Sequence, residues 1–279
     1  MALIIQDLEK LFGSFEDVLD TGFTIERILA KALARQRQGH QSSPDKFRAS
    51  AVGKPWIIQM LDKWSVDRGG RKMFSISSMM KMVDGIVTQL WVEQMIELFP
   101  MTFDAEVELI YQDVIGHADI VIKRDNEVVL LECKSMASYL ISTFKKAPND
   151  NYGYLSQLSF YTSCLKIKYP HHRVTGAFVL YDRSSAKFTL VQIADFAISK
   201  KFERIATVVP ELLKIGRLDF DTLLEKVTIP PPMNGVIPPP MQGSRWCTSL
   251  YANNGKHAHL RTNEEIVQSL RVRSEFTEF

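Results

Sequence analysis

The sequence is poor in cysteine, and it contains no long apolar run. Only three of its 279 residues are cysteines, Cys133, Cys164 and Cys247, and their wide spacing argues against a disulfide framework or a zinc site. No segment approaches the roughly 18 consecutive apolar residues that a membrane span requires. Residues 1–25 carry several acidic side chains, which is not typical of a secretory signal. We therefore expect a reduced protein of the cytoplasm without a membrane partner.

The chain also lacks a strong charge bias and a phosphate-binding loop. Its net charge is +2, so any surface for nucleic acid must come from local asymmetry. The pattern GxxxxGK[ST] does not occur, which argues against an intrinsic motor. Charged residues make up 24% and hydrophobic residues 46% of the chain, as in ordinary globular proteins. The length suffices for a full core in one elaborated domain.

A local charge asymmetry exists in residues 31–72. This segment holds ten lysines and arginines against three aspartates, and it includes Trp56 and Trp64. Such a segment can form a surface that follows a phosphate backbone, with aromatic rings on which bases stack. It can equally be a solvated basic face whose tryptophans belong to the core. The pattern leaves both interpretations open.

Residues 115–134 predict two β-strands joined by a tight turn. β-rich runs flank the polar segment 124–127, which has the composition of a turn. If the hairpin closes over Asp125 and Asn126, Asp119 lies opposite Glu132. Because side chains alternate along a strand, Glu132 and Lys134 share a face and Cys133 points away.

This hairpin would place two carboxylates and one amine at the end of an otherwise apolar pair of strands. Carboxylate oxygens are preferred ligands of Mg²⁺, and bound Mg²⁺ can clamp a phosphate and activate water. The amine of Lys134 could orient that water or offset negative charge on the phosphate. The alternative is an ion-pair network in which Lys134 lies between Asp119 and Glu132.

A family resemblance strengthens the first interpretation. The segment Gly116-His117-Ala118-Asp119 followed by Glu132-Cys133-Lys134 resembles the signature of the PD-(D/E)XK nuclease superfamily. Downstream, Gln157 and Tyr161 match the Gln-x-x-x-Tyr motif on a predicted helix, 152–168. That motif is typical of the RecB-like branch, which includes CRISPR-associated and phage exonucleases.

The resemblance covers roughly residues 48–190, with a trace near 246–251, and it implies a fold. We expect an α/β, restriction-endonuclease-like core with a mixed central β-sheet flanked by helices, and a helical N-terminal extension. The expected boundaries are 1–72 for the partly basic extension, 73–225 for the nuclease core, and 226–279 for a Pro-rich linker and a tail that packs on the core. The remaining elements are predicted as strands at 103–112, 174–182 and 187–192, and as helices at 78–98 and 194–217.

The resemblance also implies a set of catalytic and metal-binding residues. Asp119 and Glu132 would hold Mg²⁺ or Mn²⁺ together with the backbone carbonyl of Cys133. Lys134 would position the attacking water, and Gln157 and Tyr161 would support that arrangement.

A further metal ligand is expected from the helix predicted at 78–98. RecB-like nucleases often carry a histidine there, and this sequence has Gln89 in that position, with Glu93 one turn later. Either side chain could supply an oxygen to the metal, or both could be polar residues of a solvent-facing edge. The sequence does not choose between them.

Candidate contacts to nucleic acid come from three segments. They are Arg48, Ser50, Lys54 and Trp56 in a segment similar to the entry segment of RecB-like nucleases, His117 beside the motif, and Lys145 and Lys146 in a predicted mobile loop, 135–151. A structural role is the more favoured interpretation for His117.

The C-terminal region departs from the family pattern. Trp246 and Cys247 resemble the cysteine cluster that binds iron and sulfur in some RecB-like nucleases, but Lys54 occupies an expected cysteine position. Four thiolates are needed for such a cluster, so we expect no iron–sulfur cluster. The proline runs at 230–232 and 238–240 predict stiff, extended spacers. We expect the tail to pack near residues 48–56.

The resulting expectation is a Mg²⁺- or Mn²⁺-dependent DNA exonuclease of phage or mobile-element DNA processing or recombination. A helicase or a single-strand-annealing recombination protein would be its partner, and self-association into a homo-oligomer stays open. The alternatives are a structure-specific or restriction-type endonuclease, a catalytically silent nucleic-acid-binding module on the same fold, and a structural protein.

Overall fold

The computed structural model describes residues 3–13, 28, 30–32, 34–35, 47–67, 76–97, 99, 101–112, 114–148, 150, 153–193, 202, 222, 224–225, 227–242, 244, 246–255 and 257–275. The elements, in chain order, are α1 (Leu3–Gly13), β1 (Phe47–Arg48), η2 (Ala49–Ala51), α3 (Trp56–Asp67), α4 (Ile76–Glu97), β2 (Phe103–Tyr111), β3 (Val114–Arg124), β4 (Glu127–Met136), α5 (Ser138–Lys146), α6 (Tyr154–Lys168), β5 (Arg173–Asp182), β6 (Lys187–Gln192), η3 (Pro239–Met241), α9 (Cys247–Leu250) and α10 (Asn263–Glu275). None of the helices in these ranges combines the length and the hydropathy of a membrane span.

Within the described residues, six strands form one mixed sheet. β3 pairs with β2 and β4 in antiparallel orientation and with β1 in parallel orientation, and β5 pairs parallel to β4 and antiparallel to β6. Parallel neighbours need a long crossover, which α5 and α6 supply between β4 and β5. The expected mixed central sheet flanked by helices is therefore confirmed.

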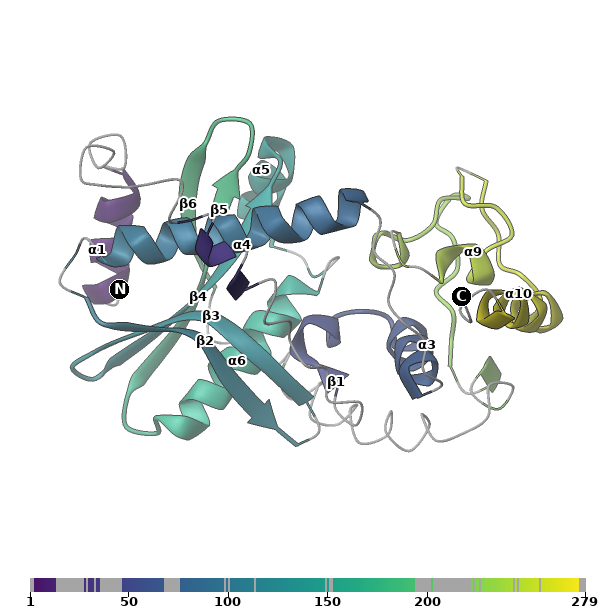
Figure 1. Ribbon diagram of the computed structural model, residues 1–279, viewed down its shortest axis with the longest axis horizontal. Helices are drawn as coiled ribbons and strands as arrows, with labels where there is room; N and C mark the ends of the chain where they lie inside the picture. Colours follow the sequence, from purple (N-terminus) through teal and green to yellow (C-terminus); the bar gives the residue numbers. More distant parts are fainter. Residues whose placement is uncertain are drawn as a thin grey trace.

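The two faces of the sheet bury different sets of helices (Figure 1). Along β4, Val128 and Leu130 belong to a core that includes α3, α5 and α6. Val129 and Leu131 belong to a second core that includes α1 and α4. Because helices cover both faces of the sheet, the sequence of β4 is a continuous run of apolar residues rather than an alternation of apolar and polar ones. This burial places the residues that follow Leu131 in the interior.

One predicted loop is a helix. The segment 135–151, expected to be a mobile loop, contains α5. Ile141 and Phe144 are buried on one side of it, and the Phe144 ring packs edge-on against Phe178 with the centroids 5.4 Å apart. Leu140, Ile141 and Phe144 lie at helical spacing, so the sequence carried a short periodic signal for this helix that was not used. The predicted helix 194–217 and the loop expected at 36–44 lie outside the described residues, apart from position 202.

The proline-rich segment differs from the extended spacer expected there. The chain turns at Asn234 and Gly235, both in the left-handed region, and Ile237 and Met241 are buried in the core. The Tyr251 hydroxyl donates a hydrogen bond of 2.6 Å to the carbonyl of Pro230. Proline restricts the local backbone, but the burial of neighbouring apolar side chains decides where the segment goes.

The tail also contacts α3. The indole Nε1 of Trp246 donates a hydrogen bond of 3.0 Å to Oδ1 of Asp62, and Trp246 shares a core with Phe47 and Ile57. The domain boundaries expected from the sequence stay a prediction.

Gly116 on β3 leaves no room for a side chain, so Gly116→Ala should destabilise the fold. A Cβ there would lie 2.5 Å from Cβ of Ala49 and 2.6 Å from Cε1 of Tyr161. Overpacking of this kind costs about 1–3 kcal/mol. Urea unfolding measures it.

Gly85→Ala is the matched control, because a Cβ at Gly85 within α4 meets nothing within 4 Å. Alanine in the interior of a helix should stabilise the protein by about 0.5–1 kcal/mol. Equal effects of the two substitutions would contradict the packing around Gly116.

Candidate active site

The site lies where β3 and β4 separate. Their ladder ends at the pair Ile120 and Leu131, so Asp119 and Glu132 are the first residues beyond it. The backbone N–H of Cys133 donates a hydrogen bond of 2.7 Å to Oδ2 of Asp119. The Asp119 carboxylate thus accepts a hydrogen bond that a backbone carbonyl would accept in a continuous β-ladder. The register is the one that the turn at Asp125 and Asn126 predicted.

The β3 backbone is irregular at Asp119. Ala118 belongs to the core on the α6 side, whereas Ile120 belongs to the core on the α4 side. Residues two apart on a regular strand share a face. Glu106, which lies across from Asp119 on β2, has φ of 52° and is absent from the pairs of that ladder. Strict alternation therefore fails here, so His117 and Asp119 do not have to share a face although they are two residues apart.

Lys134 is held from several sides. Its Nζ lies 2.6 Å from Oε1 of Glu132, donates to Oε1 of Gln157 at 3.3 Å, and lies 5.2 Å from the centre of the Tyr154 ring. The Glu132 side chain is 1% exposed and that of Lys134 is 17% exposed. The predicted shared face of Glu132 and Lys134 is therefore present, and it turns toward α6.

Gln157 and Tyr161 connect this cluster to β3. Gln157 Nε2 lies 3.3 Å from the Tyr161 hydroxyl, and that hydroxyl also bonds the backbone of His117. The imidazole Nε2 of His117 itself lies 3.6 Å from Oε2 of Glu108 on β2. The two motif residues of α6 are thus brought to the site, whereas the His117 ring contacts a neighbouring strand.

Burial governs the electrostatics of the site. Burial, and then the charge of Glu132, raises the pKa of Asp119 well above its usual range, and burial also raises the pKa of Glu132. Burial opposes the charge on Lys134, but the Glu132 and Asp119 carboxylates outweigh it and raise the pKa of Lys134. The Lys134 amine is therefore a cation at neutral pH and cannot act as a base.

Glu132 has one oxygen without a partner. Its Oε2 is buried and accepts no hydrogen bond from any residue in the described part of the chain. An unsatisfied buried carboxylate oxygen is costly, and a cation beside it would remove that cost.

The oxygens around Glu132 suit a hard divalent cation. Glu132, Asp119 and the carbonyl of Cys133 offer the donors that Mg²⁺ and Mn²⁺ prefer. Over the described ranges, no three acidic, histidine or cysteine side chains converge on one point. A metal ion here would therefore take the rest of its coordination from backbone, amide and water oxygens, as Mg²⁺ commonly does.

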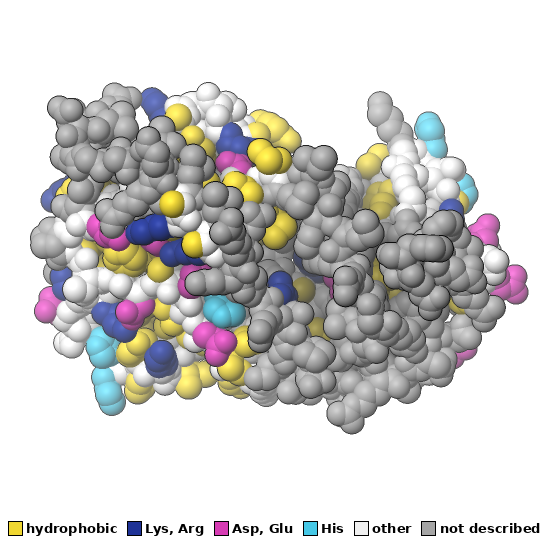
Figure 2. Space-filling model, viewed as in Figure 1, with side chains coloured by type: hydrophobic (Ala, Val, Ile, Leu, Met, Phe, Trp, Pro, Cys, Tyr) yellow, Lys and Arg dark blue, Asp and Glu magenta, His cyan; other side chains and the backbone are white. Residues whose placement is uncertain are grey.

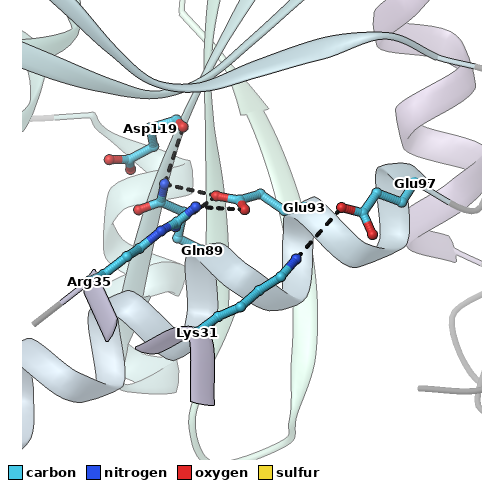
Figure 3. A network of polar contacts seen from close by, with 6 residues as sticks. All are labelled: Lys31, Arg35, Gln89, Glu93, Glu97 and Asp119. Carbon is cyan, nitrogen blue, oxygen red and sulfur yellow. Dashed lines mark hydrogen bonds and ion pairs between the residues drawn. The ribbon is translucent and has the colours of Figure 1, made fainter. Parts of the chain in front are cut away.

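The two candidate metal ligands on α4, Gln89 and Glu93, have different hydrogen-bond partners (Figure 3). Both oxygens of Glu93 accept hydrogen bonds of 2.9 Å from the guanidinium of Arg35. Gln89 Nε2 donates to Oε1 of Glu93 at 3.0 Å and to the backbone carbonyl of Asp119 at 3.2 Å. Glu93 is already neutralised by a protein cation, so Gln89 is the better candidate.

The segment η2 lies against the start of α6. A Cβ on Gly53 would lie 2.1 Å from Cα of Gly153, so the two backbones touch. Arg48 and Ser50 are exposed, and Lys54 is half-buried. The Trp56 side chain lies outside the described residues. Arg48 and Ser50 of this segment are therefore on the surface of the protein.

Two of the described basic residues in the stretch 31–72 are paired with carboxylates of α4. Lys31 pairs with Glu97 at 3.8 Å, and Arg35 pairs with Glu93. On the face drawn in Figure 2, described lysines and arginines lie beside aspartates and glutamates. Lys145 and Lys146, which the sequence analysis lists as candidate contacts to nucleic acid, are exposed in the last turn of α5.

Sequence reasoning missed Glu106, Tyr154 and the role of Arg35. The position of Glu106 opposite Asp119 follows only from the β2–β3 register. Tyr154 precedes the Gln157 motif by three residues and shares its helix face, so the spacing carried a weak signal. Arg35 was part of a charge run that carried no information about its partner.

Asp119→Asn should stabilise the metal-free protein at neutral pH. The raised pKa of Asp119 means that wild-type stability falls as pH rises from the ordinary aspartate range through the raised pKa, and the variant lacks this slope. Asparagine can still accept the Cys133 hydrogen bond. Thermal unfolding with a chelator should show a Tm higher by roughly 2–4 °C, the shift that about 1 kcal/mol produces in a chain of this size.

Glu132→Gln is the contrasting variant, because it removes the counter-ion of the buried Lys134 amine. Its Tm should fall in the same assay. If Asp119→Asn lowers the Tm at every pH tested, the argument that the buried charge of Asp119 destabilises the protein is wrong.

Comparisons with known proteins found similarity only to solved structures, and that similarity is distant. No family model and no curated protein matches the sequence. Among solved structures, an alkaline exonuclease, LHK-Exo, from Laribacter hongkongensis has 15% identity and a TM-score of 0.44 over 62% of this chain and 90% of that one. The same enzyme in complex with dAMP has 18% identity and a TM-score of 0.44.

A phage related exonuclease from Haemophilus somnus 129PT has 12% identity and a TM-score of 0.40 over 61% of this chain and 94% of that one. Because these identities and TM-scores are low, what those proteins do does not carry over to this chain. Its own residues must supply the functional evidence.

Proposed function

We propose that this protein is a metal-dependent deoxyribonuclease that hydrolyses phosphodiester bonds, with exonucleolytic digestion as its mode. The observation that carries the proposal is the buried Glu132 carboxylate at the end of the β3–β4 ladder. One of its oxygens binds the Lys134 amine and the other has no partner among the described residues. A purely structural ion pair would not leave a buried oxygen unsatisfied at this point.

The carboxylates of Asp119 and Glu132, with the Cys133 carbonyl and the Gln89 amide oxygen, would hold one Mg²⁺ or Mn²⁺ ion. When bound, the ion would polarise the phosphate and lower the pKa of the attacking water. In the reaction, the water oxygen forms a bond to phosphorus, the bond to the leaving ester oxygen breaks, and the water proton passes to solvent while the leaving oxygen gains one.

Lys134 contributes a fixed positive charge. Its raised pKa keeps the amine protonated, so it donates hydrogen bonds to the water or to a phosphate oxygen and offsets the negative charge that grows there. Gln157 and the Tyr154 ring hold the amine in place, and Tyr161 holds Gln157. Preorganisation of this kind is what makes such a charge effective in catalysis.

Exposed basic residues on α5 and β1 would contact the DNA backbone. We assign this role to Lys145 and Lys146 at the end of α5 and to Arg48 in β1. Duplex unwinding, where needed, would come from a partner helicase, and phage or mobile-element DNA processing is the setting that we propose.

One observation favours a second candidate. Gln89 is a neutral ligand, and Arg35 withdraws Glu93 from the metal. Fewer anionic ligands would weaken metal binding. A nucleic-acid-binding module without turnover is therefore the alternative on the same fold.

Lys134→Ala and Asp119→Asn should each lower DNA cleavage at least a hundredfold. The first removes a positive charge that acts on the reacting phosphate, and the second removes a charged ligand of the metal ion. The assay follows end-labelled linear single- and double-stranded DNA with Mg²⁺ or Mn²⁺, with and without chelator. Lys123→Ala is the control, since Lys123 pairs with Asp104 on the exposed part of the sheet.

A covalently closed circle in the same assay distinguishes the modes of cleavage. An intact circle beside degraded linear DNA supports an exonuclease, and a cut circle supports an endonuclease. DNA binding without cleavage in either metal would leave the binding module as the function.

Charge reversal of both Lys145 and Lys146 to glutamate should weaken DNA binding roughly tenfold at low salt, with a smaller effect as salt increases. The rate at saturating DNA should stay unchanged, because neither side chain touches the reacting atoms. The matched control reverses Lys166 and Lys168, which occupy the last turn of α6 in the same way. Equal losses in the two double variants would argue against α5 as a contact.

A further inference from the structure

Two ion pairs join α4 to the described residues between 28 and 35, here called the N-terminal segment. Lys31 pairs with Glu97, and Arg35 pairs with Glu93, so the partners are four residues apart on both segments. Ile28 and Ala32, from the same segment, are buried against Leu90 of α4. The segment therefore packs on α4 with Arg35 at the end that faces the site, as Figure 3 shows.

The two ion pairs differ in kind. Lys31 and Glu97 are 3.8 Å apart and are 37% and 41% exposed, which is typical of a surface pair of little consequence. Arg35 and Glu93 make two hydrogen bonds of 2.9 Å, and the Glu93 side chain is 4% exposed. A buried, forked pair has a fixed geometry that a surface pair lacks.

The Arg35 pair fixes the orientation of the Gln89 amide. Both groups that Gln89 Nε2 contacts, the Glu93 carboxylate and the Asp119 backbone carbonyl, can only accept hydrogen bonds. The NH₂ group must therefore face them, and the Gln89 oxygen must face away. In Figure 3 that oxygen lies on the side of the Asp119 carboxyl group, where it can serve a cation.

Arg35 also brings a positive charge to the carboxylates of the site. Its guanidinium interacts electrostatically with Glu93, Glu106 and Asp119. A divalent ion bound by Glu93 would have to displace this guanidinium first. The N-terminal segment thus supplies a cation at a point where a second metal ion could otherwise bind.

We propose that Arg35 is a positioning residue that replaces a second divalent ion, so that the active site holds a single metal ion. Arg35 neutralises Glu93 and, through Glu93, turns the oxygen of Gln89 toward the single ion at Asp119 and Glu132. The inference rests on the proposed function, because it assumes that those two carboxylates bind a metal.

The test is the number of Mn²⁺ ions bound per chain, measured by titration with electron paramagnetic resonance of the free ion. The wild-type chain should bind one ion. Arg35→Met should bind two, because the released Glu93 carboxylate becomes a ligand. The double variant Arg35→Met with Glu93→Gln should return to one. None of these counts depends on catalytic activity.

Two further variants serve as controls. Lys31→Met removes the neighbouring ion pair and should still bind one ion. Arg35→Lys keeps the charge but loses the forked geometry, and it should also bind one. Thermal unfolding in the presence of Mn²⁺ verifies that each variant is folded. If Arg35→Met does not fold, Arg35→Gln, which also removes the charge, takes its place in the titration with the same expected count of two.

The possible counts separate the two proposals. Two ions on the wild-type chain, or one ion on folded Arg35→Met, would overturn the role of Arg35 and leave the nuclease proposal standing. A wild-type chain that binds no Mn²⁺ would overturn the proposed function and this inference with it.

Discussion

The separation of β3 from β4 beyond the pair Ile120 and Leu131 is the constraint on which the site depends. Beyond Ile120 and Leu131, the strands no longer satisfy each other's backbone groups. The Cys133 amide then turns to the Asp119 carboxylate, which fixes this side chain beside Glu132.

The burial of charged side chains at this point costs free energy, and side chains from three parts of the chain offset that cost. Lys134 offsets Glu132 from the same strand, and Gln157 of α6 supports the amine. Arg35 offsets Glu93 on the other side of the sheet. Raised pKa values at Asp119 and Glu132 show that the compensation is incomplete. Incomplete compensation is common where a site is built to bind a ligand rather than to maximise stability.

Several parts of the fold were predictable because they depend on local pattern. The apolar run before Glu132 predicted a buried strand, and the polar turn at Asp125 and Asn126 predicted the register. The four-residue spacing of Gln157 and Tyr161 predicted a shared helix face. Helix α5 was missed although Ile141 and Phe144, three residues apart, form its buried face.

The sequence by itself thus determined the hairpin, the neighbouring positions of Asp119, Glu132 and Lys134, and the type of chemistry that they allow. These features follow from periodicity and turn composition, which act over a few residues. Only the tertiary structure decided that Glu93 belongs to Arg35 and that Gln89 faces Asp119. Those contacts join segments far apart in the chain, and their partners depend on how the N-terminal segment packs on α4, which no local pattern encodes.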